Sequence, residues 1–215
     1  MVTAPGITVT VSPNPGGLTI TQAVPLTATV TKDGTVYLVN GDNMGGLGDS
    51  NARQHFNIGS EIHSVGAFWN NNFYIAASNG PLLSFSFNTS TNLFNTSVAS
   101  QSSFNYGWPG PSPSVSSSGL SNGIVWALDN TNYCTNQSPG CGPAVLHAYD
   151  ATNLRTELWN SSRVSGDTAG KAVKFTVPTV ANGKVYIGTR GNNTGGVFGS
   201  TSISGELDVY GLKPN

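Results

Sequence analysis

The chain has 215 residues, a formal net charge of -1 and only 9% charged side chains, far below the roughly 25% of typical soluble domains. Its Lys and Arg residues are scattered singly, which excludes a surface that tracks nucleic-acid phosphates, and no apolar run approaches the roughly 18 residues of a membrane span. Abundant Gly, Ser, Thr and Asn, together with 4 Trp, 7 Tyr and 9 Phe, indicate many short strands joined by turns rather than a disordered chain.

Residues 1–31 differ from the rest of the chain. The first residues have neither a basic nor an apolar region, so we expect no signal peptide there. Residues 7–13 alternate β-branched and polar side chains, as a half-buried strand does, and residues 18–21 and 24–31 supply two more candidate strands. The pattern resembles the first strands of bacterial immunoglobulin-like domains, but it covers only a fraction of such a domain. The segment is a remnant of that fold, a linker strand or an edge strand for the part that follows.

From residue 32 onward, a turn followed by a short apolar strand recurs along the chain. The clearest copy is residues 181–189, and weaker copies lie at 32–39, 70–76 and 121–127. The aligned aromatic residues are 37, 52 and 60 positions apart: Tyr37, Tyr74, Trp126 and Tyr186. A four-stranded propeller blade takes about 40–50 residues, so the longer gaps imply insertions. Second strands are expected at 81–87, 144–149 and 205–212, each forming an antiparallel hairpin with a first strand, and almost no helix is expected.

Residues 123–159 resemble the blade repeat of pyrroloquinoline-quinone-type propellers. Tyr149-Asp-Ala-Thr-Asn153 corresponds to the Leu-Asp-Ala-x-Thr-Gly segment of that repeat, and Trp159 to its tryptophan. The resemblance implies an all-β fold, a partial β-propeller of quinoprotein-like four-stranded blades over 32–215, preceded by the short β-strand segment 1–31. It also implies that five aromatic residues dock blades structurally: Tyr37, Tyr74, Trp126, Trp159 and Tyr186.

No catalytic residue, metal ligand or cofactor is assigned. The family's quinone site uses adjacent cysteines and Glu, Asn and Asp ligands, and this chain has no adjacent cysteine pair and only three Glu. His55 and His63 flank Glu61 without the helix that a zinc motif needs, and His147 is expected to be an ordinary blade residue. The Gly-rich loop 41–49 offers oxygen ligands for Ca²⁺, but a turn between strands explains it without an ion.

Two loops are of functional interest. Cys134 and Cys141 flank a Pro-Gly turn, which favours a loop disulfide and an oxidising compartment, with two free thiols as the alternative. The aromatic and proline-rich residues 104–113 offer a candidate binding surface through Phe104, Tyr106 and Trp108, with a packed connection between blades as the alternative.

The sequence therefore favours a non-catalytic extracytoplasmic β-propeller module for protein or glycan binding or for surface structure, secreted, periplasmic or at the cell surface. Its expected partners are a protein or a glycan, or copies of itself, with no nucleic acid and no membrane insertion. The enzymatic alternative is a fragment of a secreted quinone-dependent oxidoreductase whose cofactor residues lie elsewhere. A third alternative is a self-assembling filament or surface-layer subunit in which residues 1–31 pair with a neighbour's free edge.

Overall fold

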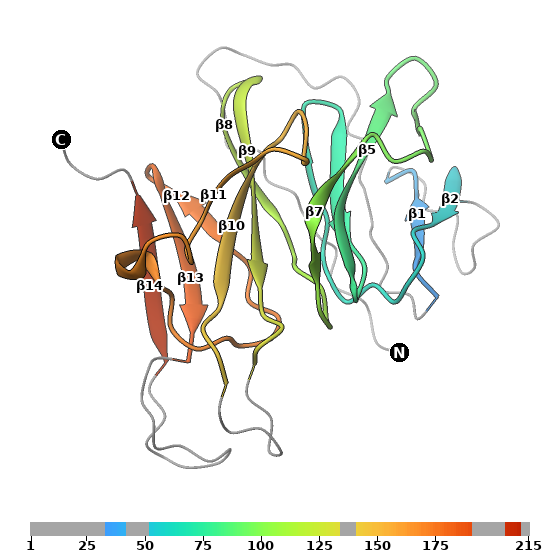
Figure 1. Ribbon diagram of the computed structural model, residues 1–215. Coiled ribbons are helices and arrows are strands. Elements are labelled where there is room, and N and C mark those ends of the chain that lie inside the picture. The colour runs from blue at the N-terminus through green and yellow to red at the C-terminus, as the bar shows by residue number, and fades with distance from the viewer. Residues whose placement is uncertain (1–32, 42–51, 134–140, 191–204, 212–215) are drawn as a thin grey trace.

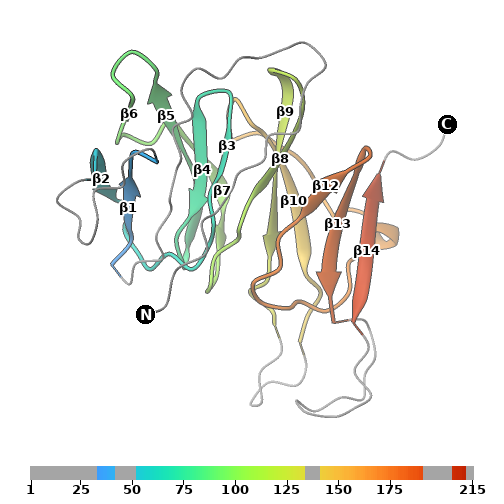
Figure 2. The ribbon, with the colours of Figure 1, turned by 180° about the vertical axis from the view of Figure 1, so that it is seen from behind.

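The computed structural model describes residues 33–41, 52–133, 141–190 and 205–211. Within these ranges, every regular element is a β-strand except one 3-10 turn at Ser165–Asp167. The strands form four antiparallel sheets that follow one another in chain order (Figure 1, Figure 2). The predicted all-β class with almost no helix is confirmed, while the strand segment predicted at 1–31 lies outside the described residues.

The first two sheets contain the first half of the described chain. The first pairs β1 (Thr35–Leu38) with β2 (Gln54–Asn57). The second runs in the order β3-β4-β5-β7, and the short β6 pairs with the far end of β5. Its strands are β3 (Ala67–Trp69), β4 (Asn72–Ala76), β5 (Gly80–Asn88), β6 (Leu93–Phe94) and β7 (Ser100–Tyr106).

The last two sheets continue the same up-and-down order. The third is the four-stranded meander of β8 (Ser114–Ser118), β9 (Ser121–Asp129), β10 (Val145–Asp150) and β11 (Glu157–Asn160). The fourth has three strands, β12 (Thr179–Ala181), β13 (Lys184–Thr189) and β14 (Glu206–Gly211). The β1–β2 and β12–β14 sheets lie at opposite ends of the molecule, so the described residues form an open row and not a closed ring (Figure 2).

The turn-and-strand repeat seen in the sequence forms the strands that it predicted. The four aligned aromatic residues lie on β1, β4, β9 and β13. Three of these strands pair with the predicted second strand, as in the register Tyr74↔Ser84, Trp126↔Ala148 and Tyr186↔Val209. The turns before β4 and β13 contain Asn residues with positive φ, including Asn71 (φ 58) and Asn182 (φ 50), because Asn tolerates the left-handed conformation that a tight hairpin requires.

Three apolar layers hold the sheets together, one between each pair of neighbours. Strand β4 shows why, because alternate side chains of a strand face opposite sides of its sheet. Phe73 and Ile75 belong to the layer facing β1 and β2, whereas Tyr74 and Ala76 belong to the layer facing the third sheet. A third layer, which includes Leu146 and Ile187, joins the third sheet to the fourth. Both inner sheets are therefore buried on two faces.

Strand β7 has no counterpart among the strands that the sequence predicts. Residues 104–106, part of the predicted loop 104–113, form the last part of this strand, which pairs with β5. Its buried positions include the small polar residues Ser100 and Ser102 instead of a run of apolar side chains. Their hydroxyls accept hydrogen bonds from the backbone amides of Leu154 and Leu82, at 3.1 and 2.9 Å. A hydroxyl with a backbone donor can be buried without the cost of an unpaired polar group, so hydrophobic alternation gave no signal.

Candidate functional site

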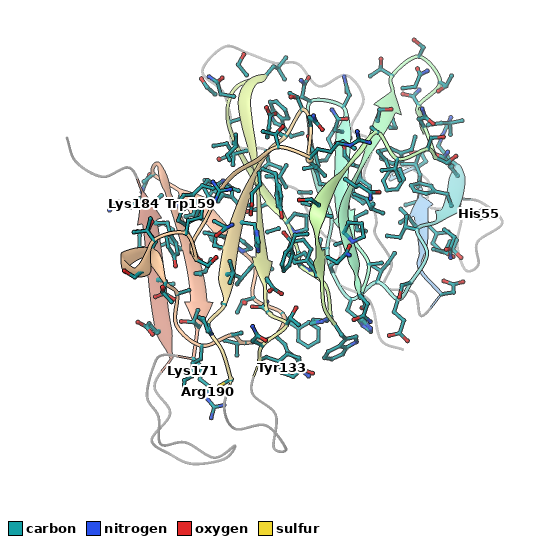
Figure 3. The ribbon with its side chains drawn as sticks, in the orientation of Figure 1. His55, Tyr133, Trp159, Lys171, Lys184 and Arg190 are labelled. Carbon is teal, nitrogen blue, oxygen red and sulfur yellow. The ribbon has the colours of Figure 1, made fainter. Side chains whose placement is uncertain are left out.

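Aromatic and charged side chains gather at one end of the sheets. They come from the connections β2–β3, β7–β8, β9–β10 and β11–β12, which are far apart in the sequence. We call His63, Trp108, Tyr133, Lys174 and Phe175 the loop-end cluster. Figure 3 shows Tyr133 at this end of the molecule, close to Lys171 and Arg190 in the view. The cluster exists only because the four connections meet.

The ammonium group of Lys174 lies against two aromatic rings. Its Nζ is 4.2 Å from the ring centroid of Trp108 and 3.9 Å from that of Tyr133. The two rings are themselves in contact, with centroids 6.1 Å apart and planes inclined by 56°. All three residues are half-buried. Since a cation over an aromatic face gains about 0.5–2 kcal/mol, the lysine side chain has a defined position despite its flexible stem.

His63 and Glu61 extend the cluster on the other side of Trp108. The imidazole ring meets the indole edge to face, with a centroid distance of 5.5 Å. Its Nε2 lies 3.0 Å from Glu61 Oε2, in a pair whose side chains are 28% and 39% exposed. The Glu61 carboxylate is thus already paired, and the sequence expectation that this His/Glu set forms no zinc site stays a prediction. Among the described residues, no group of three or more His, Cys, Asp or Glu side chains is arranged to hold a metal.

Phe175 has an unusual backbone and an exposed ring. Its φ is 63°, and its side chain is 60% exposed while meeting Trp108 edge to face at 6.0 Å. Every other non-glycine residue with positive φ in the described ranges is an Asn. For an aromatic residue this conformation costs of the order of 1–3 kcal/mol, and such strain concentrates at functional sites. The chain therefore holds an apolar ring out in solvent at an energetic disadvantage.

Hydrogen bonds between the connections hold Trp108 in place. The Gly107 amide donates to Thr131 Oγ1 at 2.9 Å, and the Thr131 amide donates to Asp129 Oδ1 at 2.9 Å. A Cβ on Gly107 would lie 2.7 Å from the Thr131 side chain, so the close approach requires glycine. On the other side, Ser78 Oγ donates to the Pro109 carbonyl at 3.1 Å. The β7–β8 connection is thereby attached to the second and third sheets.

The structure separates the three residues predicted to bind a ligand. Trp108 is in the loop-end cluster, whereas Phe104 and Tyr106 belong to strand β7. Tyr106 is only 1% exposed, so a ligand at the surface has no access to its ring. Phe104 packs against the ring of His147 with centroids 4.6 Å apart. Tyr133, Lys174 and Phe175 were not predicted, because no motif connects three residues that only tertiary packing brings together.

His147 is buried between the second and third sheets. Its Nδ1 lies 2.6 Å from Glu157 Oε1, and Glu157 also accepts from Asn160 and Arg163. Its ring stacks parallel to that of Tyr149, 5.9 Å away, and its Nε2 has no hydrogen-bond partner within the described ranges. Burial lowers the pKa of His147, against the opposing effect of the Glu157 carboxylate. Burial thus disfavours the charged form of this ring, which packs as an element of the interface.

The five aromatic residues expected to dock blades have different positions. Tyr74 is buried and donates a hydrogen bond to the carbonyl of Ala151, in the turn after β10 of the third sheet, at 2.7 Å. Trp159 packs at the layer between the third and fourth sheets, and its ring lies 5.5 Å from that of Tyr210. Trp126 packs at the same layer, whereas Tyr37 and Tyr186 are half-buried on β1 and β13. Tyr74 and Trp159 therefore make contacts between sheets.

Two loop predictions fall partly outside the described residues. Cys134 lies outside the described residues, so the predicted disulfide between Cys134 and Cys141 stays a prediction. Cys141 itself is not a free thiol. The Ca²⁺ alternative rests on loop 41–49, of which only Gly41 is described.

Comparison with known proteins yields no match, either to a protein-family model or to a curated protein. The described residues include no helix with the length and apolar character needed to cross a membrane.

Proposed function

We propose that the chain is a non-catalytic extracytoplasmic module of β-propeller type that binds a glycan through the loop-end cluster. The composition, poor in charge and rich in hydroxyl and amide side chains, supports a protein that functions outside the cytoplasm. The cluster supports binding, because it presents aromatic rings and a fixed ammonium group at the surface.

Two features of the fold support propeller geometry. The third sheet is an antiparallel four-stranded meander, and the second follows the same order with one short added strand, as propeller blades do. In addition, the first strands of consecutive sheets approach one another, since β8 contacts both β3 and β12. Sheets that radiate from an axis have their first strands closest together. The resemblance of residues 123–159 to a quinoprotein blade agrees with this arrangement.

The exposed ring of Phe175 beside Trp108 is the observation on which glycan binding rests. The C–H face of a pyranose ring is apolar and flat, and it stacks on aromatic rings while its hydroxyls remain in water. Two adjoining rings at a rigid surface provide such a platform at little entropic cost, because the loops are already fixed by hydrogen bonds. The strained φ of Phe175 makes sense if the ring is needed outside the core.

Affinity electrophoresis and titration against a panel of soluble neutral and acidic polysaccharides test this proposal. We expect retardation by at least one of them, and a loss of about tenfold or more in affinity for Trp108→Ala and Phe175→Ala, as for residues at the centre of a binding site. Phe68→Ala is the matched control, because Phe68 is 46% exposed on β3, outside the loop-end cluster. Absence of binding to every polysaccharide, with the fold intact by circular dichroism, contradicts the proposal.

Self-association is a second candidate function, and the outer face of the fourth sheet favours it. Leu207 and Val209 are 64% and 48% exposed there, and Val209 lies opposite Tyr186. The two inner sheets bury both faces in apolar layers, whereas β13 contributes to one layer only. A second copy is the proposed occupant of this face. Light scattering should then show a dimer or larger species that Leu207→Asp dissociates, and a concentration-independent monomer contradicts this candidate.

A further inference from the structure

The ammonium group of Lys174 has N–H donors that make no hydrogen bond within the described ranges. A lysine Nζ carries three N–H donors and no acceptor. The rings of Trp108 and Tyr133 attract its charge, but they accept no conventional hydrogen bond. Within the described ranges, Lys174 makes no ion pair and no hydrogen bond. The side chain thus keeps its position through ring contacts while its donors remain free for an anion.

The carboxylates near the cluster are engaged elsewhere. Glu61 pairs with His63 at 3.0 Å, and Asp129 accepts from the backbone amide of Thr131 at 2.9 Å. Lys171 lies toward the same end of the molecule in the view of Figure 3, and no ion pair within the described ranges involves Lys171 or Lys174. No described carboxylate therefore neutralises the charge of Lys174.

The rings decide which kind of anion fits. Phosphate alone would not use the exposed face of Phe175 or the indole of Trp108. A sugar acid uses both features, because its pyranose ring stacks on an aromatic face while its carboxylate projects from the ring edge. A single ammonium suits this group, since lysine acts as a point charge and not as a bidentate fork.

We infer that the loop-end cluster takes a carboxylate-bearing sugar, a uronic acid within a polysaccharide, with Lys174 binding the carboxylate. This inference rests on the proposed glycan-binding function and names its ligand class. Stacking on Trp108 and Phe175 supplies the affinity shared by all sugars, and Lys174 supplies the preference for acidic ones.

An oligogalacturonate and its methyl ester are the probes, because they differ only in the charge of the carboxyl group. Isothermal titration of the wild-type chain should show the acid binding about tenfold or more tightly than the ester, the factor of one charge-assisted hydrogen bond. Added salt should weaken binding of the acid and leave the ester unchanged. Equal affinities for acid and ester overturn the inference while leaving glycan binding intact.

Substitutions of lysine residues test whether Lys174 is the source of the preference for the acid. Lys174→Gln should lose the preference for the acid, Lys174→Arg should recover most of it, and Lys184→Gln, an exposed lysine on β13, should behave as wild type. If Lys174→Gln does not fold, the comparison of acid and ester on the wild-type chain still tests whether the site prefers a carboxylate. A preference that survives in folded Lys174→Gln overturns the inference. Binding of neither probe, nor of any polysaccharide in the panel, refutes the proposed function as well.

Discussion

A hydrogen bond between two buried tyrosines provides a sharp test of how the second and third sheets pack. The hydroxyls of Tyr106 on β7 and Tyr149 on β10 lie 2.9 Å apart, and both residues are 1% exposed. Burial raises the pKa of Tyr149 to about 12, so both hydroxyls are neutral at ordinary pH. Each hydroxyl is the hydrogen-bond partner of the other.

This mutual bond predicts similar effects of two similar substitutions. Tyr106→Phe leaves the Tyr149 hydroxyl buried without that partner, and Tyr149→Phe does the same to the Tyr106 hydroxyl, so each should lower the free energy of unfolding by about 2 kcal/mol. The double variant removes both polar atoms and should cost about as much as either single variant, which gives a coupling energy of about 2 kcal/mol.

Urea unfolding of the four proteins measures these energies, with thermal unfolding as a check at about 2–4 °C per kcal/mol for a chain of this length. The slope of the urea transition should be the same in all four, because the same surface is exposed on unfolding. Strictly additive single effects would refute the packing described for these two sheets.

Three further predictions concern other parts of the fold. Burial holds the pKa of His147 below 6.5, so the unfolded chain binds a proton there more readily than the folded chain. The free energy of unfolding should therefore fall as the pH drops below about 6.5. In urea titrations, His147→Gln should flatten this part of the pH profile, and an unchanged profile contradicts the prediction. A Cβ on Gly123 would lie 2.6 Å from the Trp69 ring, so Gly123→Ala should lower the free energy of unfolding in urea by about 1–3 kcal/mol. Gly166 has open space around it, so Gly166→Ala should change that free energy by no more than about 0.5 kcal/mol. Equal effects of the two substitutions contradict the packing described around Gly123. Phe175→Asn should raise the free energy of unfolding in thermal melts by up to about 1 kcal/mol, because Asn accepts a φ of 63°. The same variant should weaken glycan binding, because it removes the exposed ring. A destabilised variant argues against backbone strain at Phe175.

Local pattern was enough to predict the strands that are buried on both faces. Tyr74 and Trp126 each lie in a short apolar run after an Asn-containing turn, and such a run can satisfy its backbone only by pairing with neighbours. The same reasoning failed for β7, whose buried positions are filled partly by Ser100 and Ser102. Their burial depends on donors from Leu154 and Leu82, which no local pattern reveals.

The candidate site was predictable only in part, for a related reason. Trp108 is flanked by Gly107 and Pro109, which marks it as part of a turn with a large aromatic side chain. Lys174 and Phe175 have no such context, and their role comes from meeting Trp108 across a long sequence separation. Contacts of this kind are set by the packing of whole sheets.

Nuclear magnetic resonance of the tryptophan indoles tests the central claim most directly. The chain has 4 Trp residues, and the indole N–H groups of Trp69 and Trp126 donate to the Gly119 carbonyl and to Ser116 Oγ, at 2.9 and 2.8 Å. On titration with oligogalacturonate, we predict that the indole signal of Trp108 shifts and that those of Trp69, Trp126 and Trp159 do not. A shift at another tryptophan with none at Trp108, or no shift at any of them, would contradict the assignment of the loop-end cluster as the binding site.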